Sequence, residues 1–204
     1  MNSVPKIAVT ALAVLVLASC GSTSTPAKTT KSGSSASASA SPSSTVAPAG
    51  GSAMSGTGYT YHLPNAWEDI SAQLKRSQPG IDTGGRAKPA TPPFTANMNT
   101  LTTPSRISGA PSKSDLDALA AQIKQEVATL APTVATKPQT TIAGAPAVHQ
   151  EGRANSSGTK FYLVQYFAIY KGNNYGLTFA FPSSTNAAGR GRIVEPVLAS
   201  WKWS

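Results

Sequence analysis

The residues best placed for acid–base chemistry are His149 and Glu151, which lie two positions apart in a segment predicted to be a β-strand. Because alternate strand residues project from the same face, the carboxylate could orient the imidazole as a general base. The same spacing is typical of a solvated strand face, and the chain has no Gly-x-Ser-x-Gly motif to supply a nucleophile. We therefore favour a structural role for this pair over a catalytic one.

Other catalytic and metal-dependent functions lack their usual residues. The 204 residues include two histidines, one cysteine and eight acidic residues, without His-x-x-His or paired-cysteine spacing. Asp115 and Asp117 lie in the first turn of a predicted helix, where capping and the helix dipole account for acidic residues. The net charge of +9 is spread thinly, with 12% charged residues, unlike the clusters typical of nucleic-acid binding. We expect no enzyme, no metal or cofactor site and no nucleic-acid partner.

The single cysteine lies where lipidation chemistry would use it. Residues 7–17 are almost wholly apolar, a run too short to cross a bilayer but typical of a signal peptide. The run leads into Leu17, Ala18, Ser19 and Cys20, where the small residues suit the groove of a signal peptidase. The thiolate of Cys20 would then take a diacylglyceryl group. Alternatives are a plain secretory signal with an incidental cysteine and a membrane-anchored helix.

This pattern predicts a signal peptide at 1–19 and a membrane partner reached through the lipid on Cys20. A thioether-linked diacylglycerol and an N-acyl chain on Cys20 would give three acyl chains. This number exceeds what stable anchoring requires, which predicts a location on the extracytoplasmic side of the cell membrane. Residues 20–57 follow as the lipidated cysteine and a Ser-, Thr-, Ala- and Pro-rich tether that lacks a hydrophobic period. We predict this tether to be disordered.

Residues 58–204 carry the periodic patterns of one folded domain. Strands are predicted at 59–63, 94–101, 140–143, 147–151, 160–170 and 175–181, with a hairpin turn at 171–174. Helices are predicted at 70–76, from Ser114 to before Pro132, and at 184–200, where Pro196 should kink or break the helix. The Gly- and Pro-rich stretch 78–93 is predicted to be a long surface loop.

The strand at 160–170 decides the fold class, because both of its faces are apolar. Such a strand belongs at the centre of a sheet that is covered on both sides. The helix that begins at Ser114, with Asp117 at capping-box spacing, carries an apolar stripe suited to packing on that sheet. The stripe consists of Leu116, Leu119, Ile123, Val127 and Leu130. Together with consecutive hairpins, these features predict an α+β fold, an α/β/α sandwich with a mostly antiparallel sheet.

The order of these motifs resembles the mycobacterial LpqN/LpqT lipoproteins. The resemblance rests on the Cys20 motif, the tether, a Tyr-x-Tyr-x-Leu-Pro-x-x-Trp segment from Tyr59 to Trp67, a Phe-x-Ala-Asn-x-Asn segment from Phe94 to Asn99, and residues 142–147. Ala66 stands where the family usually has glycine. The resemblance implies a Mog1/PsbP-like fold and a cell-envelope lipoprotein.

Aromatic residues predict a binding function. Tyrosine and tryptophan suit surfaces that are apolar yet keep a polar end. The candidates for a cleft between sheet and helix are Trp67, Phe94, Tyr162 and Tyr166, although the same rings could simply pack the core. We predict a non-catalytic domain that binds envelope or host proteins. The alternative is a lipid or glycolipid carrier that assists the transport of envelope lipids.

Overall fold

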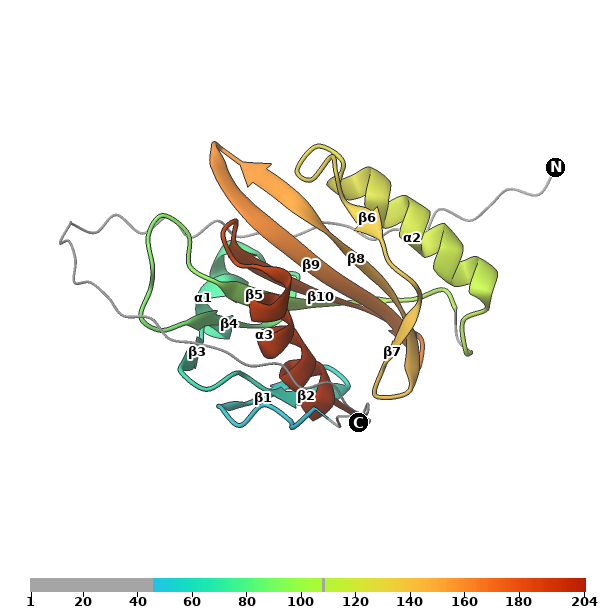
Figure 1. Ribbon diagram of the computed structural model, residues 1–204. Coiled ribbons are helices and arrows are strands. Elements are labelled where there is room, and N and C mark those ends of the chain that lie inside the picture. The colour runs from blue at the N-terminus through green and yellow to red at the C-terminus, as the bar shows by residue number, and fades with distance from the viewer. Residues whose placement is uncertain (1–45, 108) are drawn as a thin grey trace, which may run out of the picture.

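The computed structural model describes residues 46–107 and 109–204 of the chain (Figure 1). The predicted signal peptide, the motif from Leu17 to Cys20 and most of the predicted tether lie outside these residues. Among the described helices, none combines the length and apolar character needed to cross a bilayer.

The centre of the domain is an eight-stranded sheet in which every neighbouring pair is antiparallel. The strand order is β3-β4-β5-β10-β9-β8-β6, and β7 also pairs with β8. In chain order the strands are β3 Trp67–Asp69, β4 Ile81–Ala87, β5 Asn97–Pro104, β6 Ala135–Thr136, β7 Thr140–Ile142, β8 Ala145–Ser156, β9 Thr159–Tyr170 and β10 Asn173–Pro182. Lys171 and Gly172 join β9 to β10 with positive φ angles of 45° and 75°, which suit a tight hairpin and confirm the predicted turn.

Helices cover both faces of this sheet. On one face lie α1 Ser71–Ser77 and α2 Lys113–Val127. On the other lies α3 Ala187–Ser200, beside a small sheet of β1 Ala53–Gly56, β2 Tyr59–His62 and β11 Lys202–Trp203 (Figure 1). The strand β9 is buried on both sides, as its sequence predicts. The predicted α+β sandwich is confirmed.

Each face of the sheet has its own apolar core. Beneath α2, the residues Leu116, Leu119, Ile123 and Val127 are buried as predicted, while Leu130 is only partly buried. Beneath α3, the core joins the small sheet to the main sheet. The buried core residues all lie between Met54 and Trp201, so the domain carries its own hydrophobic core.

An aromatic stack connects the small sheet to the end of α3. The ring of Trp201 stacks on Tyr59 at 4.3 Å and on Tyr61 at 5.3 Å between centroids. Both tyrosine hydroxyls lie within hydrogen-bonding distance of the Thr83 hydroxyl, at 3.0 and 3.1 Å, and Thr83 donates onward to Thr100. Burial raises the pKa of Tyr61 to about 12, so its hydroxyl stays protonated.

The prediction of a surface loop at 78–93 is wrong, because β4 lies within it between β3 and β5. Gly84 and Gly85 are buried there, and a Cβ atom would overlap Leu74 at the first and Leu63 at the second. These glycines serve close packing on both faces of a strand rather than a turn.

Two predicted helix details are also corrected. The N-cap of α2 is Ser112 rather than Ser114, and its capping box uses Asp115. Ser112 follows Pro111 in an extended conformation, so the helix begins two residues earlier, and Asp117 pairs with Lys113 instead. Pro196 does not break α3, which continues to Ser200.

The folded chain begins earlier than position 58, so the predicted disorder of residues 49–57 is wrong. The Ala49 amide donates to the Pro196 carbonyl of α3 at 2.9 Å, and β1 pairs along its full length with β2. Met54 supplies the one large side chain of β1, and it is 4% exposed in the core beneath α3. The segment lacks a hydrophobic period because a single buried residue anchors it.

Substitution of Met54 tests this boundary. We expect Met54→Ala to lower the free energy of unfolding by about 2–5 kcal/mol, because the substitution leaves a cavity in a packed core. Urea denaturation measures the change, with Ala53→Ser at the exposed neighbouring position as the control. Equal stability of the two variants would show that residue 54 belongs to a disordered tether.

Candidate functional site

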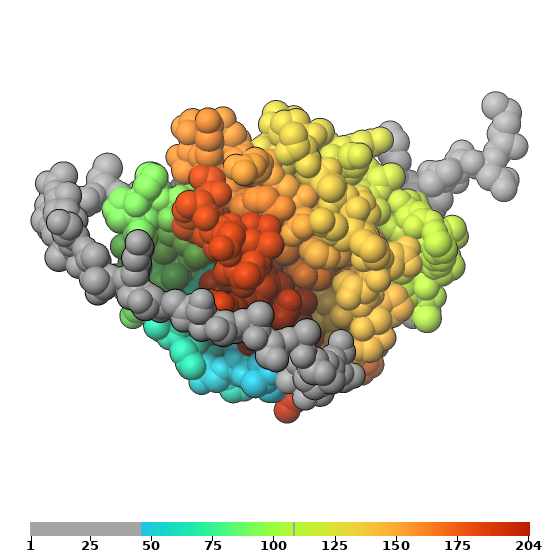
Figure 2. Space-filling view, in the orientation of Figure 1, coloured from blue at the N-terminus to red at the C-terminus, as the bar shows by residue number. Residues whose placement is uncertain are grey.

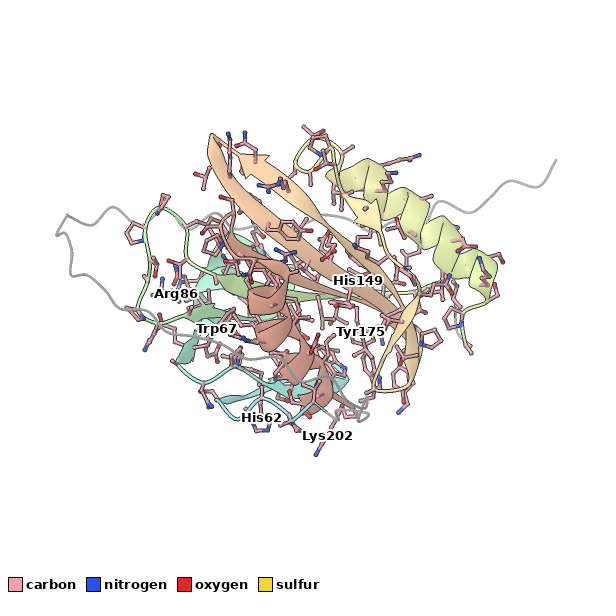
Figure 3. The ribbon with its side chains drawn as sticks, in the orientation of Figure 1. His62, Trp67, Arg86, His149, Tyr175 and Lys202 are labelled. Carbon is pink, nitrogen blue, oxygen red and sulfur yellow. The ribbon has the colours of Figure 1, made fainter. Side chains whose placement is uncertain are left out.

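A small open cleft between α3 and the strands β8 and β9 brings several charged and aromatic side chains together. Its volume is about 160 Å³, and we call it the α3 cleft. The strands contribute His149, Glu151, Val164 and Tyr166, and the helix contributes Ala187, Arg190, Gly191, Val194 and Glu195. Figure 2 shows α3 on the same face as the strands that line the cleft, and Figure 3 shows His149 beside the helix.

His149 and Tyr166 form the floor of the α3 cleft as a stacked pair. They are direct partners across β8 and β9, with ring centroids 4.4 Å apart and planes at 13°. The Nε2 atom of His149 is buried without a hydrogen-bond partner among the described residues. Burial lowers the pKa of His149 and raises that of Tyr166 to about 12, so both rings are neutral at pH 7.

Charged groups surround this neutral floor. The guanidinium of Arg190 lies 3.5 Å from the centroid of the Tyr162 ring and donates to the carbonyl of Thr185 at 2.6 Å. The Glu151 carboxylate pairs with Lys137 at 2.7 Å. The α3 cleft therefore offers an imidazole, a guanidinium and carboxylates next to a flat ring, a set suited to hydrogen bonding.

The arrangement gives little support to acid–base chemistry. His149 and Glu151 share one strand face as predicted, but Glu151 is held by Lys137 rather than directed at the imidazole. The second histidine, His62, is exposed, and its Nδ1 lies 3.0 Å from the carbonyl oxygen of Gly51. The α3 cleft is therefore better equipped to bind a polar group than to transfer its protons.

The four aromatic residues predicted to share a cleft do not meet. Tyr162 and Tyr166 lie together at α3, but Phe94 is buried on the opposite face of the sheet, stacked on Phe161 at 5.1 Å. Trp67 is buried at the far end of the strand order, away from His149 (Figure 3). Sequence periodicity shows which strand faces are apolar but not which elements cover them. The prediction therefore assigned to one cleft rings that lie on opposite faces of the sheet.

Arg190 and Glu195 are the charged members of the α3 cleft that sequence reasoning missed. Both lie in the predicted C-terminal helix, where charged residues are usually solvated. The available signal was their spacing, since positions 190, 191, 194 and 195 form one stripe of a helix.

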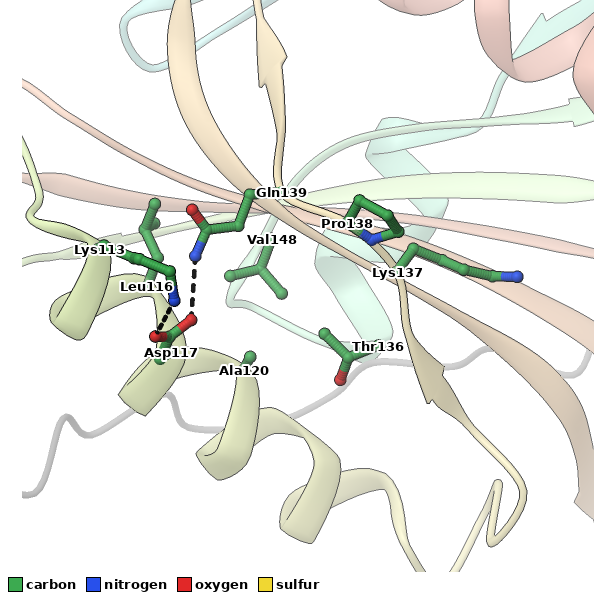
Figure 4. A pocket seen from close by; sticks show the side chains of 9 residues that line it. All are labelled: Lys113, Leu116, Asp117, Ala120, Thr136, Lys137, Pro138, Gln139 and Val148. Atoms are coloured by element: carbon green, nitrogen blue, oxygen red, sulfur yellow. Dashed lines mark hydrogen bonds and ion pairs between the residues drawn. The ribbon is translucent and has the colours of Figure 1, made fainter.

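A second depression lies between α2 and the chain that connects β6 to β7 (Figure 4). Its volume is about 320 Å³, and its charged groups are engaged in ion pairs. Asp117 accepts hydrogen bonds from Lys113 at 2.6 Å and Gln139 at 3.0 Å, as Figure 4 shows. These contacts tie the connection to α2, which is a structural role.

A third depression of about 550 Å³ lies beside the turn between β7 and β8. Apolar residues supply much of its wall, namely Ala110, Pro111, Ala145, Pro146, Ile169 and Tyr170. Its lining has few hydrogen-bonding side chains, in contrast to the α3 cleft.

Comparison with known proteins supports the fold. No protein-family model matches the chain, and neither does any curated protein sequence. Among solved structures, the cyanobacterial PsbP of Synechocystis is similar over 72% of this chain and 87% of its own, with 12% identity and a TM-score of 0.51. A protein from Bacteroides thetaiotaomicron is similar over 72% of this chain, with 10% identity and a TM-score of 0.50. This chain spans 45% of the Bacteroides protein.

The Mog1/PsbP-like fold is thus shown by structural similarity. LpqN of Mycobacterium tuberculosis, described as involved in cell envelope biogenesis, is 16% identical over 61% of this chain and 70% of its own. Its TM-score of 0.40 is below the level that indicates a common fold. Membership of the LpqN/LpqT family therefore stays a prediction from the motifs.

The half-buried imidazole of His149 predicts a specific pH dependence of stability. Because burial lowers the pKa of His149, the unfolded chain binds its proton more readily than the folded domain. This contribution to stability is complete above the unfolded value of 6.5 and declines as the pH falls below it.

We expect the free energy of unfolding to fall more between about pH 7 and about pH 5 in the natural chain than in His149→Phe. Phenylalanine keeps the ring stack on Tyr166 but cannot titrate. Urea denaturation across this range measures the difference, with His62→Phe as the control for an exposed histidine. Parallel curves for the natural chain and His149→Phe would contradict the lowered pKa of His149.

Proposed function

We propose that the protein is a lipid-anchored binding domain on the extracytoplasmic side of the cell membrane, where it engages envelope or host proteins without catalysis. The observation that carries the proposal is the α3 cleft, which presents hydrogen-bonding groups of both charge signs around a neutral aromatic floor. A volume of about 160 Å³ is below the usual range for small-molecule sites and suits one inserted side chain of a partner protein.

The chemistry of the α3 cleft favours a polar anchor from that partner. The imidazole of His149 is only partly buried at the floor of the cleft, and its Nε2 atom has no hydrogen-bond partner among the described residues, which leaves one polar group of the floor unsatisfied. Glu195 and Arg190 flank the same opening and could select for a charged or amide side chain. Aromatic and arginine residues are the usual anchors of protein interfaces.

The motif from Leu17 to Cys20 supports the anchoring half of the proposal. Cys20 precedes the first contact with α3, at Ala49, by 29 positions. A chain of that length spans at most about 100 Å, so the domain could work at the bilayer surface or well above it.

Substitution of Cys20 tests the anchor. We expect Cys20→Ser to abolish incorporation of an alkyne fatty acid, because serine cannot form the thioether. The control is Ser19→Ala, which keeps a small residue before the cysteine and should be acylated normally. Mass spectrometry of the N-terminus provides the readout, and an unacylated Cys20 in the natural protein would contradict the proposal.

Blocking the α3 cleft tests the binding half. Ala187 is exposed and lines the cleft, whereas the neighbouring Ala188 is exposed and does not line it. We expect Ala187→Trp to lower the yield of proteins crosslinked to the domain in intact cells by about tenfold, and Ala188→Trp to leave the yield unchanged.

Quantitative proteomics of the crosslinked envelope measures both yields, and the lipids retained by the domain are measured in parallel. Equal yields for the two tryptophan variants would show that partners bind elsewhere.

The alternative function, a lipid or glycolipid carrier, is favoured by the depression beside the β7–β8 turn. Its volume of about 550 Å³ and its apolar wall suit part of an acyl chain. Lipid retained by both tryptophan variants, with no protein crosslinked to the natural chain, would favour the carrier.

A further inference from the structure

Three cations surround an aromatic ring where the β8–β9 hairpin meets α3. Arg153 is the direct cross-strand partner of Tyr162, and Lys160 lies two residues before Tyr162 on the same strand face. The guanidinium of Arg190 lies over the Tyr162 ring at 3.5 Å. We call Arg153, Lys160, Tyr162 and Arg190 the cationic patch.

The cations of this patch lack neutralising partners. None of the ion pairs between described residues includes Arg153, Lys160 or Arg190. Two carboxylates lie nearby, of which Glu151 is paired with Lys137 and Glu195 lies on α3 beyond Arg190. Arg153 and Lys160 are exposed, so the patch presents positive charge to the surroundings.

The tether joins the domain on this same face. The Ala49 amide donates to the carbonyl of Pro196, six residues after Arg190 in α3. At 1.5 Å per residue, Arg190 and Pro196 are separated by about 9 Å along the helix. The chain from Cys20 therefore reaches the domain beside its cationic patch, and α1 and α2 lie on the opposite face.

We propose that the cationic patch docks the domain onto anionic phospholipid headgroups of the membrane in which Cys20 is anchored. The inference rests on the proposed anchoring, because the anchor keeps the patch close to headgroups and turns docking into an intramolecular step. Lysine and arginine side chains near an anionic surface attract its phosphates, and the attraction falls off within a Debye length. The tyrosine ring is of a type enriched at membrane interfaces.

Vesicle binding by the acyl-free chain tests the patch independently of the anchor. The test uses residues 21–204, which retain every core residue of the part of the chain that the structure describes. We expect this chain to sediment with vesicles that contain phosphatidylglycerol but not with phosphatidylcholine vesicles, and to be released at high salt. The triple variant Arg153→Gln, Lys160→Gln, Arg190→Gln should bind the anionic vesicles at least tenfold more weakly.

A matched triple variant controls for net charge. Arg76 in α1, Lys124 in α2 and Arg106 beside Ile107 are exposed, and these segments pack on the opposite face of the sheet. The variant Arg76→Gln, Arg106→Gln, Lys124→Gln should bind anionic vesicles as the natural chain does. Equal loss in both triple variants would overturn the proposal, as would the absence of binding to anionic vesicles. Binding to soluble polyphosphate without binding to vesicles would also overturn it and assign the patch to a soluble polyanion.

The two proposals fail in different ways. If Cys20 is acylated in cells but the acyl-free chain does not bind anionic vesicles, the docking proposal is wrong and the anchoring proposal stands. If the chain binds the vesicles through its patch but Cys20 carries no lipid, anchoring is wrong.

Discussion

The arrangement of the domain depends on the stack of Trp201 on Tyr59 and Tyr61. This contact holds the end of α3 against the small sheet, while the hydroxyls of both tyrosines meet Thr83 in the main sheet. Large buried rings contribute several kcal/mol each, and the shared hydroxyl contact removes the cost of burying their polar ends. The stack therefore sets the position of α3, and α3 in turn positions the cleft, the cationic patch and the entry of the tether.

Most of the architecture could be predicted from periodicity. The two-sided apolar strand β9 and the stripe of α2 predicted a covered sheet, because burial imposes a distinct repeat on each, and the consecutive hairpins predicted that the sheet is antiparallel. The strand β4 was missed because its central glycines resemble turn residues, although they are there to admit Leu74 and Leu63. The strand β1 was missed because Met54 alone anchors it. The local sequence does not show which distant side chain packs against a given residue.

The candidate site was harder to predict than the fold. The sequence singled out four residues of this region, namely His149, Glu151, Tyr162 and Tyr166. Arg190 and Glu195 lie beside them only because α3 packs over this part of the sheet, which the sequence does not show. Phe94 was grouped with them by residue type and lies on the other face. Likewise, the charge appears thinly spread along the chain, yet Arg153, Lys160 and Arg190 meet because a hairpin and a helix end converge. Arg190 belongs to both the cleft and the patch, so headgroups and a protein partner would compete for it.

The orientation of the chain acylated at Cys20 on a bilayer tests the proposed anchoring and docking most directly. Paramagnetic relaxation enhancement from gadolinium-labelled lipids in anionic nanodiscs reports how close each backbone amide lies to the membrane. If α3 and the tether share one membrane-facing side, the amides of the β8–β9 hairpin and the first turns of α3 should relax fastest, and those of α1 and α2 slowest. Equal relaxation of the two faces, or faster relaxation of α1 and α2, would contradict the account.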